Sequence, residues 1–138
     1  MSFEADSPEA RRLMAAAEKA RVMAYAPYSG FCVGAALLFK GGETVTGCNV
    51  ENASLGLSIC AERNAMTTAI ARGLREPEAI AIAGPDGVFC SPCGACRQFL
   101  VGFNPDMAVL VKSPKEPKLF TLRELLPADF SLEEENNG

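Results

Sequence analysis

The chain has 138 residues, 49% of them hydrophobic and 22% charged, and a formal net charge of -4. This length predicts a single domain, residues 1–138, that buries enough surface to fold without disulfides. The composition excludes a disordered protein, and the acidic balance argues against a nucleic-acid binder, which needs basic surface.

The first half of the chain predicts a helix followed by a hairpin. Ser7 and Pro8 form a helix-start signal, because a capping hydroxyl precedes a proline whose missing N–H does no harm there. Two strand-like runs flank a Gly41-Gly42 turn. The predicted elements are a helix from Pro8 to about Met23, a buried strand at 32–39, a strand at 44–50 and a loop at 51–59.

The second half alternates helices and strands. Gly73 ends the strongest helix, and Pro127 ends the last one. This alternation predicts a layered α/β domain with at least one parallel crossover. The predicted elements are helices at 60–72, 93–101 and 122–126, strands at 79–83, 107–111 and 118–121, a loop at 84–92, and a solvated acidic tail from about 131, most clearly 133–138.

The sequence contains no histidine, which removes Ser/His and Cys/His catalytic pairs and every imidazole metal ligand. It contains six cysteines, at positions 32, 48, 60, 90, 93 and 96. The start of the chain has no apolar signal segment, and no run is long enough to span a membrane. We therefore expect a cytoplasmic protein whose cysteines are reduced and serve as metal ligands, catalytic groups or core residues.

Three of these cysteines have the spacing of a metal site. Cys60 begins one predicted helix, and Cys93 and Cys96 begin another. Unpaired N–H groups at a helix start stabilise thiolates. Three thiolate ligands leave the fourth position of a tetrahedral zinc ion for water, as in catalytic zinc sites, so we expect one Zn²⁺ per chain.

The charged neighbours of these cysteines suggest how such a site would work. Three thiolates overcompensate the ion's charge, and hydrogen bonds from Arg63 and Arg97 to sulfur would restore the metal's acidity. Glu62 is placed to exchange protons with a metal-bound water. Alternatively, the arginines are surface residues and Glu62 is an acidic residue of a kind favoured at any helix start.

These residues match the zinc-deaminase signature in its three-cysteine form. Over about residues 10–130, the sequence also resembles the small homotetrameric cytidine deaminases. The matching stretches are 26–29 (APYS), 33–36 (VGAA), 47–53 (GCNVENA), 60–63 (CAER), 91–98 (SPCGACRQ) and 125–127 (LLP).

The resemblance implies a three-layer α/β/α fold with a mixed five-stranded sheet. It implies hydrolysis of cytidine and 2′-deoxycytidine to uridine and 2′-deoxyuridine plus ammonia, with Glu62 as proton shuttle, in pyrimidine salvage. The expected partners are a nucleoside and other copies of the chain, in a homotetramer with shared active sites, without nucleic acid or membrane.

The resemblance also implies substrate contacts. Those expected are Phe31 against the pyrimidine ring, Asn49 and Glu51 on the ribose 3′-hydroxyl, the backbone of Ala61 on the base, and Phe130 reaching in from a neighbouring subunit. Alternatively, Phe31 is a core residue and Asn49 a turn residue. Leu55 stands where many relatives carry a tyrosine, which removes a hydroxyl and a stacking face from that position.

Three rival hypotheses remain from the sequence. One is a deaminase of another aminopyrimidine nucleoside, such as blasticidin S. A second is a structural zinc module whose fourth ligand is Cys90. The third is a thiol–disulfide oxidoreductase built on Cys93 and Cys96, which leaves Cys60 and Glu62 unexplained.

Overall fold

A computed structural model describes residues 3–132. The predicted acidic tail at 133–138 lies outside the described residues. No helix within 3–132 combines the length and hydropathy needed to span a membrane.

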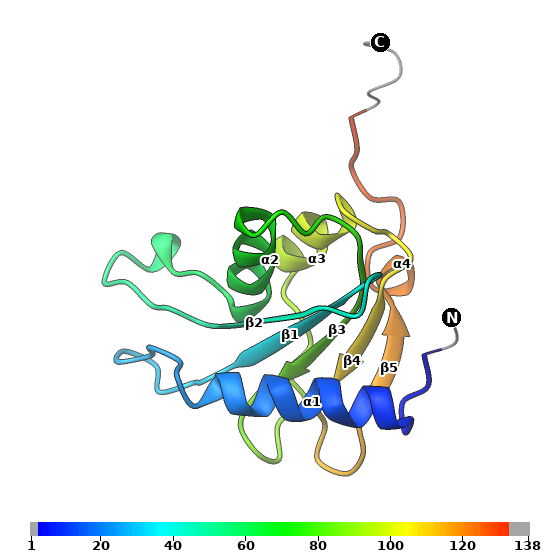
Figure 1. Cartoon of the computed structure of the whole chain (residues 1–138). Helices are drawn as coiled ribbons and strands as arrows, with labels where there is room; N and C mark the ends of the chain where they lie inside the picture. Colours follow the sequence, from blue (N-terminus) through cyan, green and yellow to red (C-terminus); the bar gives the residue numbers. More distant parts are fainter. Residues whose placement is uncertain (1–2, 133–138) are drawn as a thin grey trace.

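The fold is built on one mixed five-stranded sheet with the strand order β2-β1-β3-β4-β5 (Figure 1). β1 is antiparallel to both β2 and β3, β4 is parallel to β3, and β5 is antiparallel to β4. The single parallel pair is joined through α3, which is the predicted crossover. The strands are β1 (Gly34–Phe39), β2 (Thr44–Cys48), β3 (Pro77–Ala83), β4 (Ala108–Val111) and β5 (Lys118–Thr121).

Helices cover both faces of the sheet and make three layers. α1 crosses one face, whereas α2 and α3 lie side by side on the other (Figure 1). A buried apolar cluster fills each interface, since β1 and β3 are apolar on both faces. The helices are α1 (Pro8–Arg21), α2 (Ala61–Ala71), α3 (Gly94–Val101), α4 (Leu122–Leu125) and the short 3₁₀ helix η1 (Leu55–Leu57).

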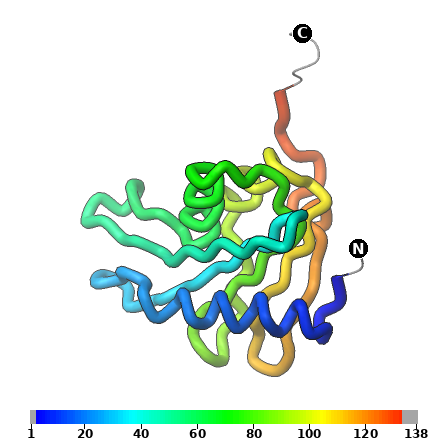
Figure 2. The backbone as a smooth tube through the Cα atoms, viewed as in Figure 1, coloured from blue at the N-terminus to red at the C-terminus, as the bar shows by residue number. Residues whose placement is uncertain are grey.

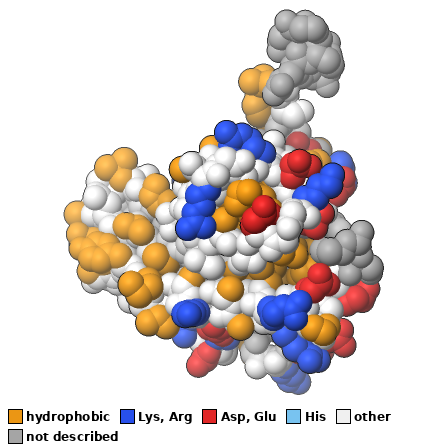
Figure 3. All heavy atoms as spheres, viewed as in Figure 1, with side chains coloured by type: hydrophobic (Ala, Val, Ile, Leu, Met, Phe, Trp, Pro, Cys, Tyr) orange, Lys and Arg blue, Asp and Glu red, His pale blue; other side chains and the backbone are white. Residues whose placement is uncertain are grey.

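Two loops extend together beyond the sheet, on the left of Figure 2. Tyr25 joins them, because its N–H donates to the carbonyl of Asn49 at 2.9 Å and its carbonyl accepts from Glu51 N at 2.8 Å. These loops carry exposed apolar side chains, including Leu55 and Leu57, which are 71% and 66% exposed. Figure 3 shows hydrophobic side chains gathered over this projection.

The predicted elements are present, with shifted ends. The first helix ends at Arg21 rather than Met23, and the first strand begins at Gly34 rather than Cys32. The predicted loop at 51–59 contains the unpredicted η1, a single turn. The mixed five-stranded sheet with helices confirms the expected fold class.

Candidate active site

Cys60 and Cys93 occupy equivalent positions on two different helices. Each is the N-cap of its helix, α2 and α3 respectively, and Cys96 lies in the first turn of α3. Neither N-cap side chain accepts a hydrogen bond from a backbone N–H of its own helix, so both sulfurs remain available as ligands. The crossover from β3 to α3 brings the second helix start beside the first.

The three sulfurs have the spacing of a metal centre. All three Sγ atoms lie within 4.8 Å of one another, with Cys60 and Cys93 3.8 Å apart and Cys93 and Cys96 3.5 Å apart. A tetrahedral zinc ion with Zn–S bonds of about 2.3 Å holds its sulfurs about 3.8 Å apart. The donor set and its spacing therefore fit zinc. Cys90 is not a member of this group.

The thiols of Cys60 and Cys96 have pKa values shifted in opposite directions. A hydrogen bond from the Cys96 thiol, helped by Arg63, lowers the pKa of Cys60 to about 5 although burial opposes the shift. The same hydrogen bond and burial raise the pKa of Cys96. The Cys96 thiol thus stabilises the Cys60 thiolate, and zinc binding would displace the proton of Cys96.

The two arginines predicted to donate to sulfur have different partners. Nη2 of Arg63 lies 3.6 Å from Sγ of Cys60, and its buried Nε has no hydrogen-bond partner among the described residues. Arg97 instead donates to three oxygens: Pro92 O at 2.8 Å, Leu125 O at 2.6 Å and Ser91 Oγ at 2.9 Å. Among residues 3–132, its guanidinium bonds no sulfur. Its hydrogen bonds connect α3 to the segment directly before it and to α4. The structure therefore differs from the predicted role of Arg97.

Glu62 is a buried carboxyl group beside the sulfur cluster. Its side chain lies on the first turn of α2, and the residue is only 4% exposed. Burial is the main reason that its pKa is raised to about 7, with a smaller contribution from the charge of Cys60. Such a group can both accept and donate a proton near neutral pH.

Two contacts that the sequence did not reveal fix the start of α2 against β2. Oδ1 of Asn64 accepts a hydrogen bond from Cys48 N at 3.0 Å, which satisfies a strand N–H. A Cβ on Gly47 would lie 2.4 Å from Ala65 N and 2.8 Å from Ala61 O, so the helix backbone packs directly on this glycine. A polar residue on the inner side of an Ala-rich helix was the only sequence signal for Asn64.

Asn49 and Glu51, expected at the ribose, hold the backbone around Phe31. Asn49 donates from Nδ2 to Phe31 O and accepts at Oδ1 from Val33 N, both at 2.8 Å. The Glu51 carboxylate accepts from Ser29 Oγ, and the same oxygen of Ser29 accepts from Phe31 N at 3.0 Å. The Ser29 hydrogen bond is the main reason that the pKa of Glu51 is lowered. The structure thus brings these three predicted residues together.

The remaining predicted substrate contacts lie in two places. Ala61 is the first residue of α2 and is 1% exposed, next to Cys60. Phe130 is 68% exposed, and its carbonyl accepts a hydrogen bond from Gln98 Nε2 on α3 at 2.9 Å. Leu55 is exposed at the tip of the projecting loops. Phe130 and Leu55 therefore point outward in the single chain.

Cys90 lies near the sulfur cluster, and Gly84 packs closely against it on the side of Phe31. A Cβ on Gly84 would lie 2.6 Å from Cβ of Cys90 and 4.0 Å from Cζ of Phe31. Burial, followed by the charges of Glu62, Cys60 and Cys93, raises the pKa of the Cys90 thiol to about 11. Cys90 is thus an uncharged, half-buried side chain next to the cluster.

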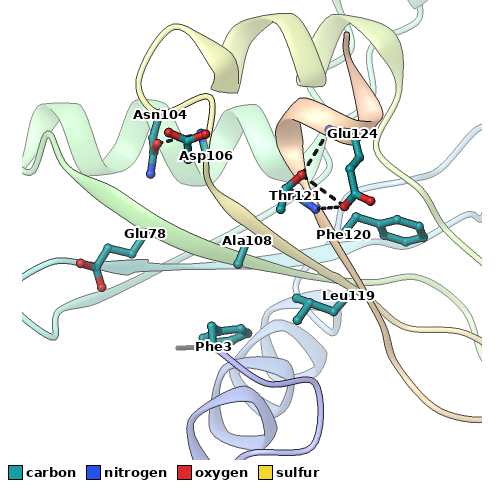
Figure 4. A pocket seen from close by; sticks show the side chains of 9 residues that line it. All are labelled: Phe3, Glu78, Asn104, Asp106, Ala108, Leu119, Phe120, Thr121 and Glu124. Carbon is teal, nitrogen blue, oxygen red and sulfur yellow. Dashed lines mark hydrogen bonds between the residues drawn. The ribbon is translucent and has the colours of Figure 1, made fainter. Parts of the chain in front are cut away.

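A separate cavity of about 470 Å³ lies at the opposite end of β3 and β4, and Figure 4 shows its lining residues. None of the predicted site residues lines it. Thr121 and Glu124 face it, but they bond each other as the capping box of α4. This cavity therefore contributes nothing to the site described above.

Comparison with known proteins places this geometry in a family. The sequence model described as the cytidine and deoxycytidylate deaminase zinc-binding region matches residues 7–112. The chain belongs to this deaminase family. A probable cytidine deaminase of Dictyostelium discoideum is 42% identical over 127 residues, covering 91% of this chain and 86% of its own. The cytidine deaminase of Halalkalibacterium halodurans is 43% identical, covering 91% and 96% respectively.

Solved structures of the deaminase family agree with the fold. The crystal structure of cytidine deaminase from Burkholderia pseudomallei superposes with a TM-score of 0.83 at 44% identity, covering 87% of this chain and 98% of the other. The expected fold, the zinc cofactor and the enzyme class, a zinc-dependent hydrolytic deaminase, are therefore confirmed.

Proposed function

We propose that the chain hydrolyses cytidine and 2′-deoxycytidine to uridine and 2′-deoxyuridine, with release of ammonia. The observation that carries this proposal is the carboxyl group of Glu62, 4% exposed and directly after the candidate ligand Cys60. Relatives about 40% identical over most of the chain are named cytidine deaminases, which favours cytidine over another aminopyrimidine such as blasticidin S.

Zinc bound by Cys60, Cys93 and Cys96 would lower the pKa of a bound water towards about 7. Glu62 accepts a proton from the water that attacks carbon 4 and passes it to the adjacent ring nitrogen. It then takes the second proton from the hydroxyl group now on carbon 4 and passes it to the leaving amino group, as the carbon–nitrogen bond breaks. The oxygen of water becomes the new carbonyl oxygen, and nitrogen departs as ammonia. Arg63 offsets the negative charge of the thiolates.

The substrate contacts extend from this centre. Phe31 stacks on the pyrimidine ring, since a flat base favours an aromatic face. Asn49 and Glu51 bind the 3′-hydroxyl, which both nucleosides carry, and the backbone of Ala61 binds the base. The support for this arrangement is that Asn49 bonds the backbone of Phe31 directly and Glu51 is linked to it through Ser29.

The working unit is a homotetramer with shared active sites, and Phe130 completes the site of a neighbouring copy. This part is supported by the apolar side chains on the projecting loops, because contiguous apolar surface marks protein interfaces. Leu55, at 71% exposure, supplies apolar bulk to such an interface. Sedimentation should give a mass of four chains, whereas an active monomer would contradict the shared site.

The cellular setting is the cytoplasm and the role is pyrimidine salvage.

The test of the activity is the loss of cytidine absorbance in the ultraviolet on purified protein whose zinc content is assayed. Cytidine and 2′-deoxycytidine should both react, at about one zinc per chain. Blasticidin S, assayed in parallel, should react poorly. Stoichiometric zinc without turnover of either nucleoside would overturn the proposal.

A further inference from the structure

Lys112 joins three segments that are distant in sequence. It follows β4, and its ammonium group lies 2.6 Å from Glu18 Oε2 on α1 and 2.5 Å from Asp86 Oδ1 in the loop after β3. It also donates to the carbonyl of Gly84 at 3.3 Å. These three acceptors match the three N–H donors of an ammonium group, so the charge is held in one position.

The environment of Lys112 distinguishes it from a surface lysine. Its side chain is only 15% exposed. Glu18 and Asp86 face it from two different elements, and Arg21 also bonds Glu18, at 3.4 Å. Without the ammonium group, the two carboxylates would lie near each other with less compensating charge. The loop after β3 would then lose its attachment to α1 and β4.

Gly84 connects Lys112 to the candidate site, because it bonds Lys112 and packs against Cys90. Its carbonyl accepts from Lys112, while a Cβ added to it would lie 2.6 Å from Cβ of Cys90 and 4.0 Å from Cζ of Phe31. The close approach leaves no room even for a methyl group on Gly84. A displacement of Gly84 toward Cys90 would therefore move the Cys90 side chain.

We propose that Lys112 is a positioning residue: by fixing Gly84 and Asp86, its ammonium group sets the positions of Cys90 and Phe31, against which the pyrimidine base is placed. The kinetic part of this inference rests on the proposed function. Lys112 contacts neither the sulfur cluster nor Glu62, so its loss should affect substrate placement more than proton transfer or zinc binding.

Three variants of the zinc-loaded protein test this role. Lys112→Met removes the charge and keeps the aliphatic stem, and Lys112→Arg restores the charge. Lys40→Met is the control, because it breaks a surface ion pair with Glu76 at the other end of β3, where both side chains are over 70% exposed. Amide hydrogen exchange of segment 84–92 is measured beside KM and kcat for cytidine.

We expect Lys112→Met to raise KM about fivefold with kcat changed less than about twofold and zinc content unchanged. Segment 84–92 should exchange faster in this variant, and Lys112→Arg should restore both values. Unchanged exchange would overturn the inference whether or not the protein turns cytidine over. A fall in kcat and zinc content at constant KM would also overturn it, because that pattern indicates only a loss of folded protein. Absence of turnover in the wild type would instead contradict the proposed function and leave the exchange test intact.

Discussion

Nη2 of Arg63 lies 3.6 Å from Sγ of Cys60, three residues earlier on the same turn of α2. A cation therefore contacts a candidate ligand whose thiol pKa is lowered, to about 5. In the proposed mechanism, this arrangement would give a cysteine-only site the charge balance that imidazole ligands provide elsewhere.

Arg63→Gln should lower turnover of cytidine about tenfold or more, because the thiolates then donate more charge to the metal and weaken its pull on water. Arg72→Gln, at the exposed C-terminal end of the same helix, is the control and should change little. The measurement is kcat at full zinc occupancy. Wild-type turnover in Arg63→Gln would remove Arg63 from the proposed mechanism.

Glu62→Gln should fold and retain zinc but lose about 10²–10⁴ in kcat, the usual contribution of a general acid–base group. The amide occupies the same buried position without carrying a proton between water and substrate. Zinc analysis and circular dichroism on the same sample separate this effect from misfolding. Retained activity would exclude Glu62 as the proton shuttle.

The same substitution should alter the pH dependence of stability in zinc-free protein. The pKa of Glu62 is raised from 4.5 to about 7, so ionisation opposes folding increasingly as the pH rises between these values. Glu62→Gln should therefore be no more stable than wild type below pH 4.5 and more stable above pH 7. The difference should approach about 3 kcal/mol, since each pKa unit is worth about 1.36 kcal/mol. Urea unfolding at pH 4 and pH 8 measures it; a constant difference would contradict the buried carboxyl.

Cys60→Ser should abolish stoichiometric zinc binding, because only two sulfur ligands remain. Cys90→Ala should keep about one zinc per chain, since Cys90 is not in the ligand group. Metal analysis of the two purified variants decides between an open catalytic site and a structural site closed by Cys90. Loss of zinc in Cys90→Ala would favour the closed site.

Gly47→Ala should destabilise the protein by about 1–3 kcal/mol, the usual cost of overpacking a filled interface. The added Cβ would lie 2.4 Å from Ala65 N, so α2 must move away from β2 and carry Cys60 and Glu62 with it. Gly56→Ala is the matched control, because nothing lies within 4 Å of its Cβ. Thermal unfolding should separate the two variants, and equal midpoints would contradict the close packing.

Local signals explain why so many elements were predictable. Ser7 caps α1 by accepting from Ala10 N at 3.1 Å, as its place before Pro8 suggests. The bounds of β5 match the prediction, because the prolines before it and the short helix after it punctuate the chain. The positions of Cys60 and Cys93 at helix starts were predictable for the same reason, since an N-cap is defined by its immediate neighbours in sequence.

The contacts that were missed depend on segments distant in sequence. Arg97 directly follows Cys96, but adjacent residues on a helix point about 100° apart, and its guanidinium reaches α4 instead of sulfur. Lys112 stands out only as a charge directly after a buried strand, and its partners on α1 and the loop after β3 are visible only in the fold. Partner contributions such as that expected of Phe130 require a second chain.

The sulfur cluster also has a mechanical consequence. Cys60 and Cys93 are separated by 33 positions in sequence, with β3 lying between them. An ion bound to both cysteines would close a loop of the chain that contains β3. Such a loop restricts the conformations of the unfolded chain, as a cross-link does. The metal would then hold the N-termini of α2 and α3 together. Its removal would weaken the packing between these two helices as well as stopping catalysis.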